Sequence, residues 1–238
     1  MCHGPSRAIV KVRAVTAPTR TITVVHMGDS ITFGQYLDPS VRWTALIEER
    51  LHADFEDVEI RAFNRGISGE TTRMGLERFP RDVQDVRPDV MTLQFGLNDC
   101  NCWQTDAGLP RVSEAAFRAN LVEMIARARR FGAGQIVLAT NHRTLRRDVL
   151  PSREIYEDAN ERYSEIVRDV AVETGVDLCD IRAAFDPFDD EKLAATLLPG
   201  PDLLHLSEEG NVVYADAMWP HVEHAAAAAL REGTLLER

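Results

Sequence analysis

Four short segments of the chain carry side chains suited to acyl chemistry, and the first of them holds an exposed serine. In Gly28-Asp29-Ser30-Ile31-Thr32 the glycine permits a tight turn, and Ser30 stands just beyond a β-branched run. A serine hydroxyl becomes a nucleophile when a neighbouring base takes its proton, and free backbone N–H groups nearby stabilise an anion. For this segment alone, a plain turn serine or helix N-cap is an equally good interpretation.

A carboxylate and an imidazole stand three residues apart near the C-terminus, in Pro201-Asp202-Leu203-Leu204-His205-Leu206-Ser207. A general base needs one imidazole nitrogen facing the nucleophile and the other N–H held by a carboxylate. A short Asp-x-x-His loop provides that orientation locally. Taken in isolation, the segment also fits a surface histidine beside a capping aspartate.

Two further segments offer hydrogen-bond donors. The stretch from Asn64 to Thr72 contains Gly66 and Gly69, which suit a loop that brings backbone close to a ligand, although it also reads as an ordinary strand-to-helix loop. In Gly96-Leu97-Asn98-Asp99 the carboxamide of Asn98 can donate to a developing oxyanion or hold an Asx turn, which is the commoner use.

Short aliphatic runs alternate with longer amphipathic stretches, which is the pattern of repeated βαβ units around a parallel sheet. The predicted strands are Thr21–Met27, Val58–Phe63, Val90–Gln94, Gln135–Thr140 and Val176–Asp180. The predicted helices are Val41–His52, Thr72–Val86, Glu114–Arg130, Arg153–Glu173 and about Gly210–Leu230. Ligands of such sheets bind beyond the carboxyl ends of the strands, where all four segments are expected to lie.

The ends of these elements are less well defined by the pattern. Pro80 and Pro88 interrupt the second helical stretch, so that helix is expected to end before Pro80 or to kink there. Residues 1–20 are an N-terminal extension in which Ala8–Val15 alternates weakly, and an edge strand, a tail and a dimer contact all fit it. Residues 21–238 are predicted to form a single domain.

Composition narrows the class of protein. The chain has 238 residues, is 45% hydrophobic and 27% charged, and carries a net charge of −11, as expected of a globular protein that repels nucleic acid and anionic lipid. A neutral or cationic small substrate suits this charge better. Its four cysteines are too few for a disulfide framework, and Cys100-x-Cys102 lacks the second pair of a zinc site. No apolar run is long enough for a membrane span or a signal-peptide core, so we expect free thiols in the cytoplasm.

Together, the four segments resemble in order and spacing the sequence blocks of the SGNH hydrolases, also called GDSL-type esterases and lipases. The matches are Gly28-Asp29-Ser30, Gly66 within Asn64-Arg65-Gly66-Ile67-Ser68-Gly69, Gly96-Leu97-Asn98-Asp99 and Asp202-Leu203-Leu204-His205, spanning about Thr21 to Val222. The resemblance implies an α/β fold of three layers, α/β/α, with a five-stranded parallel flavodoxin-like sheet and helices on both faces. It implies neither metal nor organic cofactor.

The resemblance also implies roles for individual residues. Ser30 is then the nucleophile, His205 its general base and Asp202 the group that orients His205. The oxyanion is expected among the Ser30 and Gly66 backbone N–H groups and the Asn98 amide. The Gly-x-Ser-x-Gly elbow of the α/β-hydrolases is absent, which disfavours that sister fold.

Other residues are candidates for substrate contact: Asp29 beside the serine, Trp103 in the loop with Cys100 and Cys102, and His142 with Arg143 after the fourth predicted strand. A solvated loop explains the last pair equally well, and a buried anchor explains Trp103. His26 is predicted to be a packed strand residue.

We therefore predict a serine hydrolase that cleaves a small carboxylic ester, such as an O-acetyl group on a sugar or metabolite, through an acyl-enzyme. An acyltransferase or thioesterase would use the same residues, and a silent carbohydrate- or acyl-binding module is the alternative from another class. Homo-oligomerisation is left open. Specificity is expected from four loops: Tyr36–Trp43, Asn101–Val112, Asn141–Pro151 and Phe185–Pro201.

Overall fold

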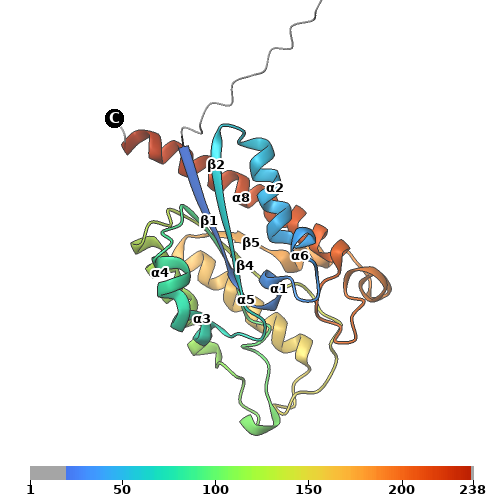
Figure 1. Cartoon of the computed structure of the whole chain (residues 1–238). Coiled ribbons are helices and arrows are strands. Elements are labelled where there is room, and N and C mark those ends of the chain that lie inside the picture. The colour runs from blue at the N-terminus through green and yellow to red at the C-terminus, as the bar shows by residue number, and fades with distance from the viewer. Residues whose placement is uncertain (1–19, 237–238) are drawn as a thin grey trace, which may run out of the picture.

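The computed structural model describes residues 20–236, which are built around a five-stranded parallel sheet (Figure 1). Its strands are β1 (Arg20–Gly28), β2 (Val58–Gly66), β3 (Val90–Gln94), β4 (Gln135–Ala139) and β5 (Asp177–Cys179), in the spatial order β2-β1-β3-β4-β5. This is the flavodoxin-like order, so the predicted sheet is confirmed. The prediction for Ala8–Val15 lies outside the described residues.

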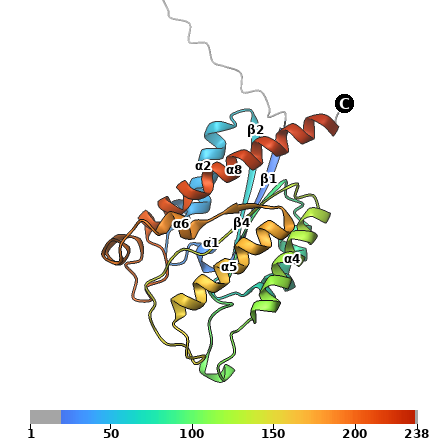
Figure 2. The same ribbon diagram turned by 180° about the vertical axis from the view of Figure 1, so that it is seen from behind.

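Helices cover both faces of the sheet. α2 (Trp43–Asp54) and α8 (Glu208–Leu236) pack together on one face, joined by the short α6 (Ile181–Phe185). α3 (Thr72–Phe79), α4 (Glu114–Arg130) and α5 (Tyr156–Thr174) form the layer on the other face, as Figures 1 and 2 show from opposite sides. The three-layer α/β/α architecture is therefore confirmed.

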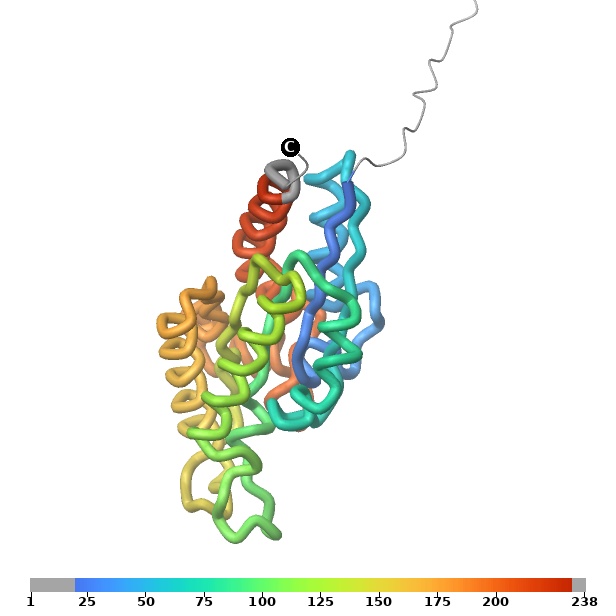
Figure 3. Tube along the Cα trace, turned by 90° about the vertical axis from the view of Figure 1, so that its left-hand side faces the viewer, coloured from blue at the N-terminus to red at the C-terminus, as the bar shows by residue number. Residues whose placement is uncertain are grey.

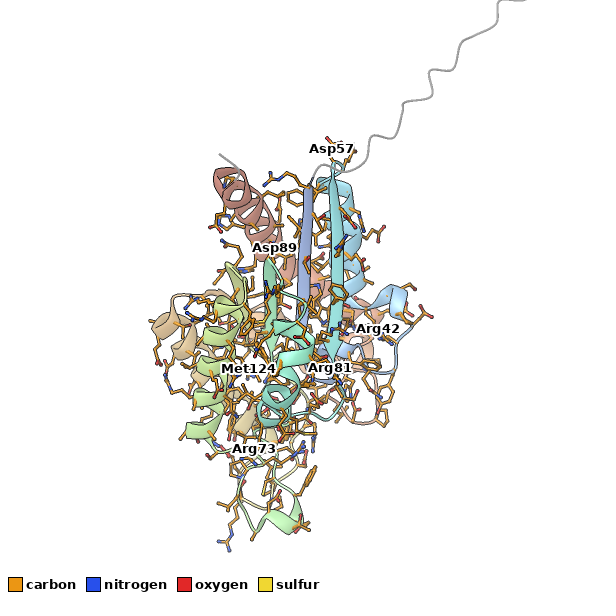
Figure 4. The ribbon with its side chains drawn as sticks, turned by 60° about the vertical axis from the view of Figure 1, so that its left-hand side comes forward. Arg42, Asp57, Arg73, Arg81, Asp89 and Met124 are labelled. Carbon is orange, nitrogen blue, oxygen red and sulfur yellow. The ribbon has the colours of Figure 1, made fainter. Side chains whose placement is uncertain are left out.

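The core follows the apolar periodicity of the sequence. All five residues of β3 are buried, as expected of a central parallel strand covered on both faces. In α4, Ser113 is the N-cap and accepts the N–H of Ala116, and the stripe from Phe117 to Ala128 is buried. Met124 belongs to that stripe and lies where α4 meets α3 (Figure 4).

Several element ends differ from the predicted ones. β2 continues three residues beyond Phe63, because its last residues, Asn64 to Gly66, pair with His26 to Gly28 of β1. α3 ends at Phe79, and a wide π-type turn over Pro80–Gln84 follows, since Pro80 cannot donate to the preceding turn. α8 runs past the predicted Leu230 and contains Pro220 within its length.

The loops at the carboxyl end of the sheet contain short helices and turns that the apolar periodicity did not predict. They are α1 (Ser30–Phe33), α7 (Asp190–Lys192) and the turns Pro39–Val41, Gln104–Asp106 and Leu193–Leu197. Figure 3 shows the long loops around residues 100–112 and 145–155 projecting from this end, away from the C-terminal part of α8. Asp57 and Asp89 lie at the opposite end, where β2 and β3 begin (Figure 4).

One further contact ties the amino end of the sheet to α8. The Arg20 guanidinium, at the start of β1, donates to the Leu230 carbonyl. Within residues 20–236, no helix combines the length and the apolar character needed to cross a bilayer.

Candidate active site

Ser30, His205 and Asp202 form a continuous hydrogen-bonded chain. Ser30 begins α1 immediately after β1, and its Oγ lies 2.8 Å from His205 Nε2. The other ring nitrogen, Nδ1, lies 2.7 Å from Asp202 Oδ2. The geometry therefore places a hydroxyl, an imidazole and a carboxylate in the order that transfers a proton away from serine.

The loop that carries the acid and the base is shaped by the acid itself. Asp202 Oδ1 accepts the backbone N–H groups of Leu204 and His205, each at 3.1 Å. Leu203, which follows Asp202, adopts a left-handed conformation with φ 54°. Burial works to raise the pKa of Asp202, but the hydrogen bonds from the His205 ring and from these N–H groups hold that pKa below its ordinary value. A charged Asp202 favours the tautomer in which Nδ1 of His205 bears the proton and Nε2 accepts from Ser30.

His142 supports this loop from behind and does not face the substrate. Its side chain is fully buried, and its Nε2 lies 2.8 Å from the Leu204 carbonyl oxygen, to which it donates. Burial lowers the pKa of His142 to about 4, so the ring is neutral at physiological pH. The predicted substrate contact of His142 is therefore wrong, because no part of the ring reaches solvent.

Asp29 is likewise enclosed. Its Oδ1 accepts the Ile31 N–H at 2.9 Å, which caps α1, and its Oδ2 lies 3.4 Å from Gln94 Nε2 and 3.5 Å from Asn98 Nδ2. Burial is the main reason that the pKa of Asp29 rises to about 7. Because the carboxyl group is fully buried, the predicted substrate contact of Asp29 is wrong, and its position instead orients α1 and the Asn98 amide.

The structure separates the two glycines that follow the second strand. Gly66 ends β2, and its N–H donates to Asn64 Oδ1 at 2.9 Å, so it is already paired. Gly69, with φ +78°, lines the same cavity as Ser30 and Asn98, and no acceptor within the described chain pairs with its N–H. The free N–H that the sequence analysis expects at Gly66 is therefore found at Gly69, three residues further along the loop.

A cavity of about 260 Å³ opens beside Ser30. Its lining comes from the segments that follow β1, β2 and β3, from three of the four predicted specificity loops, from the first residue of α5 and from the loop that carries Asp202 and His205. The residues are Ser30, Gln35, Tyr36, Ser68, Gly69, Leu97, Asn98, Asn101, Arg146, Tyr156, Asp202, Leu204 and His205. The loop over Phe185–Pro201 contributes none of them.

The two remaining residues predicted to contact substrate, Arg143 and Trp103, lie outside the cavity. Arg143 donates to Asp190 Oδ1 at 2.7 Å and to the Phe188 carbonyl at 2.6 Å, so its guanidinium braces the neighbouring loop. Trp103 is half exposed, with the Arg111 guanidinium 4.3 Å from its ring centre, and does not line the cavity. Neither residue is positioned to touch an ester at Ser30.

His26 and three of the cysteines are buried away from the cavity. His26 is fully buried in β1, with Nδ1 2.9 Å from Thr92 Oγ1, which confirms it as a packed strand residue. Cys100, Cys102 and Cys179 are buried free thiols. Among residues 20–236, no three His, Cys, Asp or Glu side chains are grouped to hold a metal ion.

The sequence analysis missed Tyr36, Arg146 and Gly69 as cavity residues. Tyr36 stands edge-on to the His205 ring, with 5.2 Å between ring centres, at a positive φ of 70°. Tyr36 and Arg146 lie inside loops predicted to set specificity, which was the available signal. Gly69 was recognisable as a second glycine in its loop, but spacing alone does not show which N–H stays free.

Comparisons with known proteins identify the family of this chain. Residues 26–213 match the model of the GDSL-like Lipase/Acylhydrolase family. Esterase TesA of Pseudomonas aeruginosa is 36% identical over 116 residues, which cover 49% of this chain and 53% of that protein. The match thus spans about half the length of that relative, and 46% of a second, the lipoprotein YqeF of Bacillus subtilis.

Longer matches come from an acetylxylan esterase of Geobacillus stearothermophilus, 26% identical over 215 residues that cover 82% of this chain and 90% of that protein. The solved structure of an acetylxylan esterase from the same organism superposes with a TM-score of 0.67 at 24% identity, covering 84% of this chain and 94% of that one, which shows a shared fold. Because the family model spans most of the chain, from the end of β1 to the first part of α8, the chain belongs to the GDSL-like lipase/acylhydrolase family.

Proposed function

We propose that this protein hydrolyses small carboxylic esters through an acyl-enzyme formed on Ser30. The observation that carries the proposal is the chain from Ser30 Oγ to His205 Nε2 and from His205 Nδ1 to Asp202, at 2.8 and 2.7 Å. Both distances lie within hydrogen-bond range before any substrate is bound. The esterase names of the relatives support the same activity.

In the first half of the reaction, Ser30 Oγ forms a bond to the ester carbonyl carbon while its proton moves to His205 Nε2. Asp202 stabilises the imidazolium by holding Nδ1–H. The tetrahedral intermediate then expels the alcohol, which takes the proton from His205. The products are free alcohol and Ser30 bearing the acyl group.

Three donors are available for the oxyanion of this intermediate. They are the backbone N–H groups of Ser30 and Gly69 and the Asn98 side-chain amide, all on the wall of one cavity. One hydrogen of Asn98 Nδ2 points toward Asp29 Oδ2, which leaves the other for the oxyanion. Such donors stabilise the transition state more than the ground state, because the negative charge develops during the reaction.

In the second half, a water molecule attacks the acyl carbon as His205 takes its proton, and Ser30 leaves with the proton returned. Hydrolysis rather than transfer to a second alcohol is supported by the openness of the site, since His205 and Asp202 remain partly exposed. A thioester would enter the same cycle, because only the leaving atom differs. A catalytically inactive binding module is disfavoured, because binding alone does not require hydrogen bonds that carry a proton from Ser30 to His205.

The substrate we propose is a short acyl ester, with an acetyl ester of a sugar or small metabolite as the leading case. The hollow between Ser30, Gly34 and Leu206 is too narrow to admit even a water molecule, and the open cavity is smaller than the roughly 300–1,000 Å³ typical of drug-sized ligands. The acetylxylan esterase among the relatives supports this choice of acyl group.

The proposal is tested with p-nitrophenyl esters of increasing acyl length, run beside acetylated sugars. We expect kcat/KM to be highest for acetate and to fall steeply with chain length. Ser30→Ala should lose turnover of every ester while keeping its melting temperature, whereas Ser152→Ala, in an exposed loop, should match the parent. Turnover that survives in Ser30→Ala would overturn the proposal.

A further inference from the structure

We propose that Arg146 binds a carboxylate of the substrate, so that the preferred esters carry an acid group close to the bond that is cleaved. The inference rests on the proposed esterase function, because it concerns the same cavity. Arg146 lines that cavity together with Ser30 and Asn98. It is the permanently charged cation among the lining residues.

The guanidinium of Arg146 is held in place before substrate arrives. Its Nε and Nη2 donate to the two carboxylate oxygens of Asp148, at 3.0 and 2.7 Å. Its centre lies 3.9 Å from the ring centre of Tyr156, a buried residue that also lines the cavity. The Tyr156 hydroxyl in turn donates to the Leu97 carbonyl at 2.7 Å, which fixes the ring. A guanidinium so fixed loses little conformational entropy when a ligand binds.

One edge of this guanidinium is left for a ligand. Nη1 of Arg146 pairs with no acceptor among residues 20–236, although the group is only about a quarter exposed. Asp148 occupies the Nε and Nη2 edge and leaves Nη1 with two N–H donors. The unfilled edge belongs to a residue of the cavity wall, so a substrate in the cavity is within its reach.

Other arginines of this protein show what completes such a pair. Five of them bridge two carboxylates each, one on either side of the guanidinium: Arg78, Arg118, Arg162, Arg168 and Arg182. Five others pair with one carboxylate each, and none of them lines the cavity: Arg50, Arg61, Arg81, Arg127 and Arg143. Arg146 has the first carboxylate, from Asp148, and lacks the second. We infer that the substrate provides the second one, because a charged acceptor makes the stronger hydrogen bond.

The charges around Arg146 allow an anion to bind there. Asp148 pairs with the far edge of the guanidinium, and Asp202, the carboxylate on the cavity wall, is engaged by His205. The remaining polar groups of the wall, such as Asn101 and Ser68, are neutral. A substrate carboxylate against Nη1 is nearer to the cation than to either acid, and the net charge of the surface is screened beyond about 8 Å at physiological salt.

The test compares phenyl acetate with 3- and 4-carboxyphenyl acetates, and with the monophenyl ester of glutaric acid, in which the acid sits on the acyl side. The measured quantity is the selectivity, defined as kcat/KM for each acidic ester divided by kcat/KM for phenyl acetate. Arg146→Met keeps the aliphatic stem over Tyr156 and removes the charge. Arg146→Lys keeps the positive charge but loses the planar pair of N–H donors that can bind both oxygens of a carboxylate. The exposed neighbour Arg147→Met is the control.

We expect Arg146→Met to lower the selectivity for at least one acidic ester about tenfold, mainly through KM, with Arg146→Lys in between and Arg147→Met unchanged. The ester that responds tells which side of the scissile bond meets Arg146. An equal effect of Arg146→Met on all four esters, or no effect, would overturn the inference while leaving the esterase function intact. A parent enzyme that cleaves none of the esters would instead contradict the proposed function.

Discussion

At the scale of single residues, the role of each group in the site depends on the hydrogen bonds that it already makes within the protein. Ser30 and His205 face each other because Asp202 fixes the imidazole and caps its own loop. Asn98 has one hydrogen directed toward Asp29, and Gly66 has its N–H occupied by Asn64. The availability of each donor therefore decides which of the predicted residues can meet an oxyanion.

Asn98 provides the sharpest prediction at this scale. Its amide should donate to charge that exists mainly in the transition state, so Asn98→Ala is expected to lower kcat about 10²–10³-fold with little change in KM. Asn98→Asp should be at least as damaging, because it places an acceptor, beside buried Asp29, where a donor is needed. Steady-state kinetics and thermal melting are measured together. Near-parental turnover with early melting in Asn98→Asp would show that Asn98 only holds its turn.

At the scale of elements, the strand-to-helix loops do the positioning. β1 delivers Ser30 directly into α1, and β3 is followed at once by the turn that carries Asn98. The loop after β2 is anchored by buried Arg78, whose guanidinium pairs with Glu70 and Asp82 and donates to the Gly28 carbonyl. Gly69 sits immediately before that anchor, at the cavity edge.

The two glycines of this loop should respond differently to substitution. A Cβ at Gly66 would lie 2.1 Å from the Phe33 backbone nitrogen, so Gly66→Ala should unfold at a clearly lower temperature. A Cβ at Gly69 meets open space, and its positive φ costs alanine only about 1–2 kcal/mol. Gly69→Ala should therefore stay folded and lose kcat as its N–H shifts. Differential scanning fluorimetry with kinetics checks both. Full activity in Gly69→Ala would contradict a role for the Gly69 N–H in binding the oxyanion.

The parallel strands and the long helices were predictable because their apolar periodicity is strong. β3 and α4 match their predicted bounds, and the apolar stripe of α4 is the buried one. The short α1 and the turns after Asp38 and Trp103 were not predictable, since each is fixed by a few local hydrogen bonds. The predictions of substrate contact for Asp29 and His142 were wrong for a related reason. A polar side chain that follows a strand can point into the protein interior, as both of these do.

At the scale of the whole molecule, two electrostatic features matter: the net negative charge of the chain and the burial of a carboxyl group beside the active site. The net charge of −11 fits a protein that avoids nucleic acid, which remains a prediction together with its cytoplasmic location. Burial nevertheless keeps one carboxyl group near the nucleophile from ionising freely. Because the pKa of Asp29 rises to about 7 on folding, its protonation is linked to global stability.

The sign of this linkage follows from the direction of the shift. The folded chain retains a proton that the unfolded chain releases near pH 4, so the contribution of Asp29 to stability is present below about pH 4 and lost as pH rises through about 7. Asp29→Asn, which removes the titration, should gain about 2–3 kcal/mol relative to the parent between about pH 5 and pH 8.5. Urea unfolding at both pH values measures this gain. Asp57→Asn, at the other end of the sheet, is the surface control, and a pH-independent difference for Asp29→Asn would contradict the linkage.

The account as a whole depends on a covalent intermediate at Ser30, which is best tested by trapping it. The full chain is mixed with p-nitrophenyl acetate, quenched in acid within the first turnover, digested and mapped by mass spectrometry. We predict one acetyl group on the peptide that contains Ser30, and none on that peptide in Ser30→Ala. An acetyl group found only on another residue, or turnover with a peptide that never carries one, would contradict the central claim.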